Sequence, residues 1–335
     1  MLSSAGPTRD SCLGALIVAL NETCDGNSWY TSTKELQLAS LDFCVACRNY
    51  QTVYLRFDEQ TPRRLLAWVD PPFQHPKRQC RTRVPRLRVR SVVWNIPTAA
   101  ELRNPIVIMS DVKHMEFGNY FGGSLEAVAW PPRLTTIEFW YSSPFNQPIN
   151  LVEWPTSLQT LQFGRSFNQP IDRVLWPDSL QEIIFGSIFD QSLEEFSWAN
   201  APSLDFGGDF NQSIVEVSWP SSLRKLCFGK CFNQPIEEVS WPNSLQKLHF
   251  GEEFDQPIKR VAWPDSLQTL NFGCDFNQAV GEASWPGSLQ GLHFGDSFDQ
   301  PIDGVSWPAS LKELSFGNAF NQLIEGVSWP DSLRR

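Results

Sequence analysis

The feature that most constrains the fold of this chain is the regular recurrence of tryptophan. Ten tryptophans between residues 130 and 329 stand 21 to 24 residues apart, and most steps are 22 residues. Between them the same sequence returns, as in WPTSLQTLQFGRSFNQPIDRVLW. Self-similarity at a fixed period in the twenties is typical of solenoids, in which each repeat stacks on the next. The period therefore predicts a stack of about ten 22-residue coils.

Within one repeat, the apolar spacing indicates a short β-strand. Leu161 and Phe163 stand two residues apart, so they face the same side of an extended chain. Gly164 is expected to end the strand, where a side chain would crowd the turn. The Trp-Pro pair favours another extended segment, because the residue before proline avoids the α region. The predicted fold is mainly β: a parallel β-solenoid whose strands pair from coil to coil.

Two polar positions are expected to fix the turns. The serine of the Pro-x-Ser motif can bond nearby backbone, and it occurs at Ser157, Ser179, Ser222 and Ser244, among others. The segment Phe-(Asn/Asp)-Gln occurs nine times, with Asp at 190, 255 and 299 and Asn elsewhere. Asn and Asp share only an acceptor oxygen, so we expect this position to accept a backbone N–H. A calcium or amide-ligand site is the alternative, and a structural ladder is favoured.

Charge and repeat content divide the chain into two parts. Residues 1–100 carry 13 Lys/Arg and 8 Asp/Glu, whereas residues 101–335 carry 14 Lys/Arg and 29 Asp/Glu. We therefore predict a divergent basic N-terminal region, or cap, at residues 1–108 and a solenoid at residues 109–335. Because binding to nucleic acid depends on neutralising phosphates, an acidic solenoid is not expected to bind it.

The repeat resembles a known family. The segment F-N-Q-P-I followed by W-P-x-S-L-Q-x-L-x-F-G is similar to the FNIP repeat, a variant of the leucine-rich-repeat group. Nine near-complete copies cover Val112 to Leu333, about two thirds of the chain. The resemblance implies a curved or twisted right-handed solenoid that acts in protein interaction, in some members joined to an F-box that recruits a ubiquitin-ligase scaffold. Here Trp-Pro replaces the common Leu-Pro, and residues 1–100 show no F-box pattern.

Sequence motifs give little support for catalysis or cofactor binding. No Gly-rich phosphate loop, H-E-x-x-H or Gly-x-Ser-x-Gly motif is present, so we predict neither an enzyme nor a cofactor. The single Cys-x-x-Cys, Cys44 and Cys47, has Cys24, His75 and Cys80 as further zinc ligands only if the cap folds around them. Two buried thiols are favoured. With no apolar run of about 18 residues and sparse cysteines, we expect no membrane span and a cytoplasmic location.

The outward-facing strand position varies from coil to coil, whereas the leucine and phenylalanine on either side of it are repeated. Between the repeated Leu and Phe stand Gln162, Ile184, Cys227, His249, Asn271, His293 and Ser315. Solenoids diversify binding by varying such positions, so we predict a protein-interaction scaffold. A metal or proton-relay site at Cys227 and the histidines is disfavoured, because an open sheet lacks an enclosed pocket. The expected partner-contacting residues, which include the basic cluster of the face, are Arg224, Lys225, Lys230, Lys247, His249, Asn271 and His293.

Two other functions remain as alternatives, and the last coil adds a further expectation. The chain is alternatively a substrate-recognition subunit of a ubiquitin ligase, or a structural or surface-adsorbing solenoid. The sequence stops at Arg335, partway into a new coil. Phe320, Ile324, Val327 and Trp329 are expected to line an open end with an unpaired strand edge. We predict either end-to-end self-association or a chain that is a fragment of a longer product.

Overall fold

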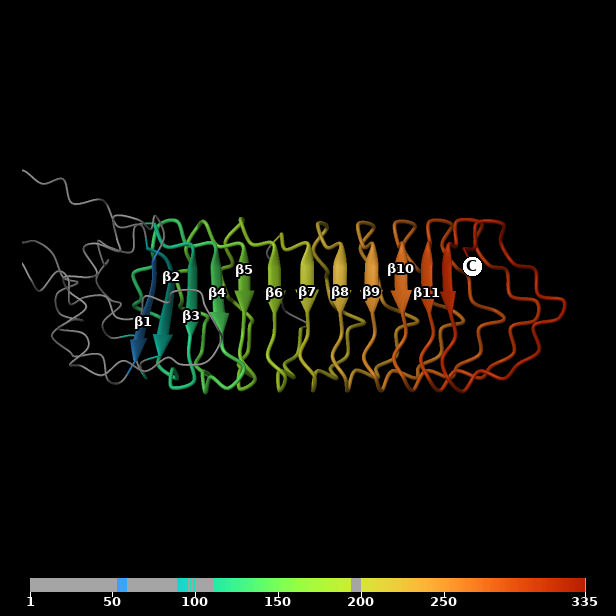
Figure 1. The fold of residues 1–335 in the computed structure, drawn as a ribbon, viewed down its shortest axis with the longest axis horizontal. Coiled ribbons are helices and arrows are strands. Elements are labelled where there is room, and N and C mark those ends of the chain that lie inside the picture. Colours follow the sequence, from blue (N-terminus) through green and yellow to red (C-terminus); the bar gives the residue numbers. More distant parts are fainter. Residues whose placement is uncertain are drawn as a thin grey trace, which may run out of the picture.

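A computed structural model describes residues 53–58, 89–95, 97, 99, 111–193 and 200–334. These residues form a twelve-stranded sheet in which the strands lie in sequence order (Figure 1), and they contain no helix. Every neighbouring pair of strands is parallel. The strands are β1 (Val53–Asp58), β2 (Val89–Asn95), β3 (His114–Phe117), β4 (Thr136–Phe139), β5 (Thr160–Gln162), β6 (Glu182–Ile184), β7 (Ser203–Asp205), β8 (Lys225–Cys227), β9 (Lys247–His249), β10 (Thr269–Asn271), β11 (Gly291–His293) and β12 (Glu313–Ser315). The predicted parallel β-solenoid is confirmed.

Two strands of this sheet precede the regular repeats. β1 pairs with β2, and β2 pairs with β3 in the register Val92 to Met115. Both of these side chains are fully buried, so the core of the solenoid continues into β2. The division of the chain at residue 108 stays a prediction, and the Cys-x-x-Cys motif with its further ligands lies outside the described residues.

Each regular coil turns at three corners. In the coil that contains β9, backbone N–H to carbonyl hydrogen bonds close turns at Pro242–Leu245 (3.0 Å), Gly251–Phe254 (3.3 Å) and Ile258–Val261 (3.3 Å). The sequence predicted the turn at the glycine and an extended segment at Trp-Pro. The third corner, at Ile-x-x-Val, redirects the chain toward the next Trp-Pro.

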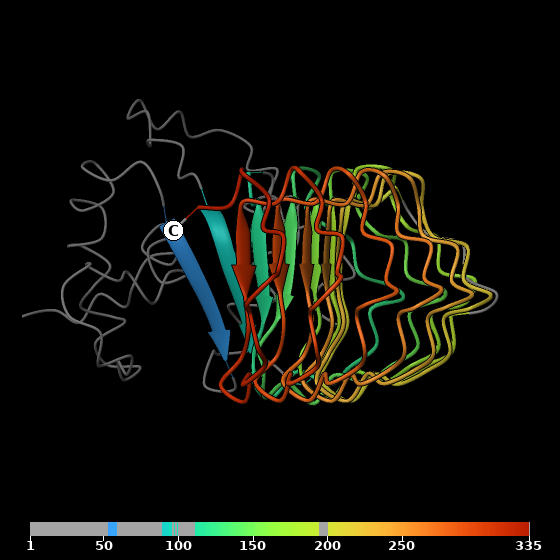
Figure 2. The ribbon, with the colours of Figure 1, turned by 90° about the vertical axis from the view of Figure 1, so that its right-hand side faces the viewer.

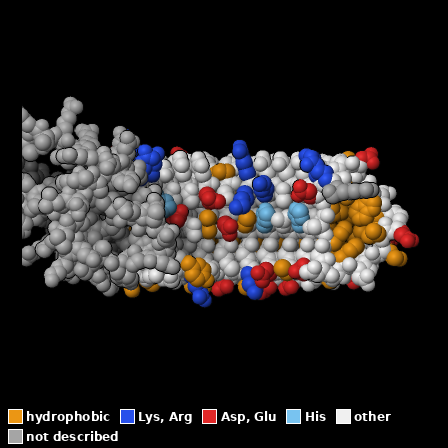
Figure 3. Space-filling view, viewed as in Figure 1, with side chains coloured by type: hydrophobic (Ala, Val, Ile, Leu, Met, Phe, Trp, Pro, Cys, Tyr) orange, Lys and Arg blue, Asp and Glu red, His pale blue; other side chains and the backbone are white. Residues whose placement is uncertain are grey.

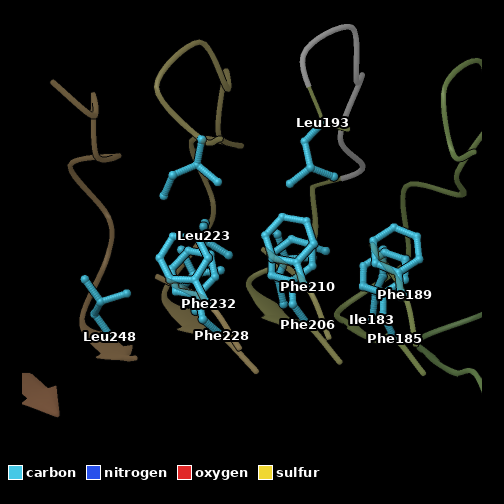
Figure 4. Packing of buried hydrophobic residues seen from close by; sticks show 14 of the residues in the cluster. Ile183, Phe185, Phe189, Leu193, Phe206, Phe210, Leu223, Phe228, Phe232 and Leu248 are labelled. Atoms are coloured by element: carbon cyan, nitrogen blue, oxygen red, sulfur yellow. The ribbon is translucent and has the colours of Figure 1, made fainter. Parts of the chain in front are cut away.

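The core consists of aromatic and leucine side chains stacked from coil to coil (Figure 4). Phe228 and Phe232 of one coil have ring centroids 4.0 Å apart, and Phe228 stacks on Phe250 of the next coil at 5.8 Å. Leu226 and Leu248, the middle residues of β8 and β9, are fully buried. Because each ring contacts rings above and below, burial in one coil depends on its neighbours.

Glycine shortly after strands β3 and β5 to β12 allows the coils to stack closely. A Cβ atom on Gly251 would overlap the carbonyl oxygen of Gly229 in the preceding coil. The predicted crowding is therefore confirmed, and it involves the backbone of the adjacent coil. The predicted serine bonds are also present, as in Ser244, whose hydroxyl donates to the carbonyl of Leu223 at 2.6 Å. Ser222 is the exception, and its side chain has no hydrogen-bond partner among the described residues, because the preceding coil is one residue short.

The Asn/Asp position forms a continuous ladder along the solenoid. Oδ1 of Asn233 accepts hydrogen bonds from the backbone N–H of Asp255 (3.0 Å) and from Nε2 of Gln256 (2.8 Å). The same backbone bond recurs on every coil from residue 146 to residue 321. The predicted backbone acceptor is confirmed, and Asp replaces Asn because the oxygen alone makes this bond.

The solenoid is a shallow arc with its strands on the inner side. Seen along the stack, the coils at both ends are displaced toward the strand side relative to the coils in the middle (Figure 2). The sheet therefore lines a concave surface. The turns and return segments form the other sides of each coil.

Candidate partner-binding face

The inner surface of the arc is formed by alternate strand residues. In the three-residue strands β5 to β10 the middle side chain is buried, and the two flanking side chains point outward. We call these outward positions of β3 to β12 the strand face. From coil to coil the buried position is an aliphatic residue, whereas the outward positions include acids, bases, amides and a thiol. The buried position is thus of one chemical type, and the outward side chains differ from coil to coil.

Three of the four predicted basic residues lie together on or beside this face. Lys225 of β8 is directly opposite Lys247 of β9, and Arg224 immediately precedes β8 and is exposed. Lys230 lies past the end of β8, in the turn that follows, and its ammonium group is 3.2 Å from Glu252. The carboxylate of Glu252 raises the pKa of Lys230. Lys230 is therefore a neutralised residue of the turn, apart from the other three.

The predicted polar residues His249, Asn271 and His293 lie on adjacent strands in register. Nδ2 of Asn271 donates to Nδ1 of His249 at 2.8 Å, because an amide nitrogen has no acceptor capacity. Burial, followed by the charges of Lys225 and Lys247, lowers the pKa of His249. At neutral pH, His249 is therefore an uncharged hydrogen-bonding group on a positively charged part of the face.

The thiol on the same face has the properties of a protonated packing residue. Burial, and then the charge of Asp205, raises the pKa of Cys227 from 9.0 to about 11. A thiol needs its thiolate form to ligate metals or attack electrophiles. Among the described residues, no group of three or more His, Cys, Asp or Glu side chains is arranged to hold a metal ion.

Sequence reasoning missed the acidic residues of the strand face. Glu116, Glu138, Glu182 and Asp205 point outward from β3, β4, β6 and β7. Glu116, Glu138 and Asp205 lie in coils whose sequences depart from the regular repeat, which hides the equivalence of their positions to Gln162. The 22-residue period could have found Glu182, which directly precedes the buried Ile183.

These features define a class of protein, the leucine-rich-repeat-like β-solenoids. A solved structure described as CroV588, a novel circular LRR protein, is 37% identical to this chain with a TM-score of 0.58, and the match covers 73% of this chain. The match covers 39% of the other chain, so the present chain spans about two fifths of its length. A family model described as FNIP Repeat matches residues 145–188, 232–275, 276–319 and 298–335. The FNIP repeats inferred from the sequence are confirmed in these segments.

Two further comparisons give negative results. A search of curated protein sequences found no significant match. Within the part of the chain that the structure describes, no helix has the length and apolar character needed to cross a membrane.

Proposed function

We propose that the protein is a non-enzymatic scaffold that binds a protein partner through the strand face. The supporting observation is the contrast between the two sides of each strand. Leu226, Leu248 and Leu270 are all fully buried, while the residues that follow them are Cys227, His249 and Asn271. A constant frame that carries variable side chains is how repeat proteins form extended binding surfaces.

The proposal also has support from the shape and charge of the face. The sheet lies on the concave side of the arc (Figure 2), where one partner can contact several coils at once. Arg224, Lys225 and Lys247 form no ion pair with any residue that the structure describes, and their charges favour contact with an acidic segment of the partner. A cytoplasmic location remains part of the proposal and rests on the sparse, unevenly placed cysteines.

Comparative affinity purification from cells that express the protein tests this assignment. The bait Lys225→Glu/Lys247→Glu reverses two charges on the strand face. The matched control Lys259→Glu/Arg260→Glu makes the same charge change on two exposed residues of a return segment. We expect partners to be lost from the first bait and retained by the control. Identical partners for wild type and strand-face variant would place the binding surface elsewhere.

A further inference from the structure

The charges on strands β3 to β11 of the strand face are divided between two halves, and β12, beyond the second half, carries the exposed acid Glu313. The strands β3 to β7 contain four acidic residues and no Lys or Arg, and the strands β8 to β11 contain two lysines and two histidines and no Asp or Glu. Figure 3 shows this face with a Lys/Arg cluster near the middle and acidic groups on its N-terminal side; on the C-terminal side the histidines lie beside a further acidic group and a further basic group. The halves meet where Asp205 of β7 lies opposite Cys227 of β8.

Two basic groups accompany the acidic half without cancelling it. His114 is 3.2 Å from Glu116 and 3.8 Å from Glu138, so it offsets part of their charge when protonated. Lys113 immediately precedes β3 at the outer end of this half. Glu182 and Asp205, which border the basic half, lie away from both groups.

Like charges on neighbouring strands are not explained by the fold. Lysines directly opposite each other destabilise a sheet, and Lys225 and Lys247 occupy such a pair. Among the described residues neither lysine forms an ion pair, although Lys230 and Lys259, outside the face, pair with Glu252 and Glu282. Lys230 and Lys259 are thus neutralised outside the face, whereas Lys225 and Lys247 on the face remain available to a ligand.

We infer that the strand face binds an extended polypeptide segment whose basic block lies over β3 to β7 and whose acidic block lies over β8 to β11. The inference rests on the proposed function, in which this face is the binding surface. Eight strand spacings of about 4.8 Å separate β3 from β11, or roughly 38 Å, which an extended segment of about 12 residues spans at about 3.3 Å per residue. A uniformly anionic polymer such as nucleic acid would be repelled by β3 to β7.

Synthetic peptides test the charge division. The probe is a fluorescein-labelled 12-residue peptide with a lysine block and a glutamate block, and its control has the same composition with the two residues alternating. In fluorescence anisotropy at low ionic strength, we expect the block peptide to bind about 10-fold more tightly, because only it places opposite charges on both halves. Binding should weaken as salt is added. Equal affinity for the two peptides would overturn the division.

Charge reversal separates this inference from the proposed function. In Lys225→Glu/Lys247→Glu the whole face becomes acidic, so we expect it to lose affinity for the block peptide and to gain affinity for hexalysine. Adding Glu138→Lys/Glu182→Lys/Asp205→Lys leaves Glu116 as the single acid on strands β3 to β7, so both signs return in the opposite order and the block peptide should bind again. Lys259→Glu/Arg260→Glu should bind the block peptide like wild type. Lys225→Gln/Lys247→Gln removes the two positive charges without adding negative ones, so a loss of affinity in this variant does not come from introduced repulsion.

The outcomes are distinguishable. If strand-face substitutions alter peptide binding but the block and alternating peptides bind alike, the face binds ligands and the charge division is wrong. If the strand-face and control variants bind every peptide as wild type does, both the inference and the proposed binding surface are wrong. Circular dichroism of each variant establishes that the β-solenoid is intact.

Discussion

The backbone N–H of Asn277 donates a hydrogen bond to Oδ1 of Asp255, one coil before it, at 2.8 Å. Nε2 of Gln278 donates to the same oxygen at 2.9 Å. We expect Asp255→Ala to lower the free energy of unfolding by about 1–2 kcal/mol, because the Asn277 N–H loses its acceptor and Gln278 Nε2 keeps only its longer bond to the Asp255 carbonyl at 3.2 Å. Asp255→Asn keeps the oxygen and should unfold at the wild-type urea midpoint. Equal destabilisation by the two substitutions would contradict the role of the shared oxygen.

The close stacking of the glycines that follow the strands predicts a large difference in stability between two Gly→Ala variants. In Gly251→Ala the new Cβ meets the carbonyl of Gly229, and separating two coils should destabilise the protein by about 2–3 kcal/mol or more. In Gly287→Ala the Cβ has no heavy atom within 4 Å, so the change should be neutral or stabilising by up to about 1 kcal/mol. Thermal unfolding of the two variants measures the difference, and similar melting temperatures would rule out close backbone stacking.

The ladder also predicts a contribution of Asp299 to the acid sensitivity of the fold. Hydrogen bonds from the Gln322 side chain and the Asn321 backbone lower the pKa of Asp299 below its ordinary value of 3.8. A depressed folded-state pKa stabilises the protein above the unfolded-state pKa, and this stabilisation is lost as the pH falls through the folded-state value. Below about pH 4, the urea midpoint of wild type should therefore fall more steeply than that of Asp299→Asn. Asp303→Asn, outside the ladder, is the control and should keep the wild-type slope.

The raised pKa of Cys227 predicts selective alkylation of the described cysteines. A shift from 9.0 to about 11 lowers the thiolate fraction at pH 8 about 100-fold, and only the thiolate reacts. In mass spectrometry after iodoacetamide treatment, Cys227 should be modified much more slowly than the exposed Cys274. Comparable rates at the two sites would show that burial does not suppress ionisation of Cys227.

Exposed apolar side chains in the last coil predict self-association. Leu323 is 82% exposed and Ile324 is 54% exposed, whereas the equivalent Ile302 of the preceding coil is fully buried. Covering such side chains is favourable, so we expect an average mass in light scattering that rises with concentration and falls in Leu323→Asp/Ile324→Asp. A clean monomer at tens of micromolar would exclude this association.

The repeat period made most of the fold predictable from the sequence, because leucine and phenylalanine at fixed positions permit only one stacking register. The serine bonds and the Asn/Asp ladder were predictable for the same reason. Two features were not. Ser222 has a regular sequence context but lacks a partner because of a deletion in the coil before it. Lys230 is close to Lys225 in sequence, yet the turn at Gly229 removes it from the strand face.

The stacking of tryptophans from coil to coil has a consequence for the fluorescence of the protein. Trp219 stacks on Trp241 with ring centroids 6.5 Å apart, and Trp241 stacks on Trp263 at 6.3 Å. At such separations, excitation absorbed by one indole migrates to the next before emission. Because the ring planes in these pairs differ by only 12° and 17°, each transfer rotates the plane of emission little, and polarisation is lost gradually as excitation passes from coil to coil.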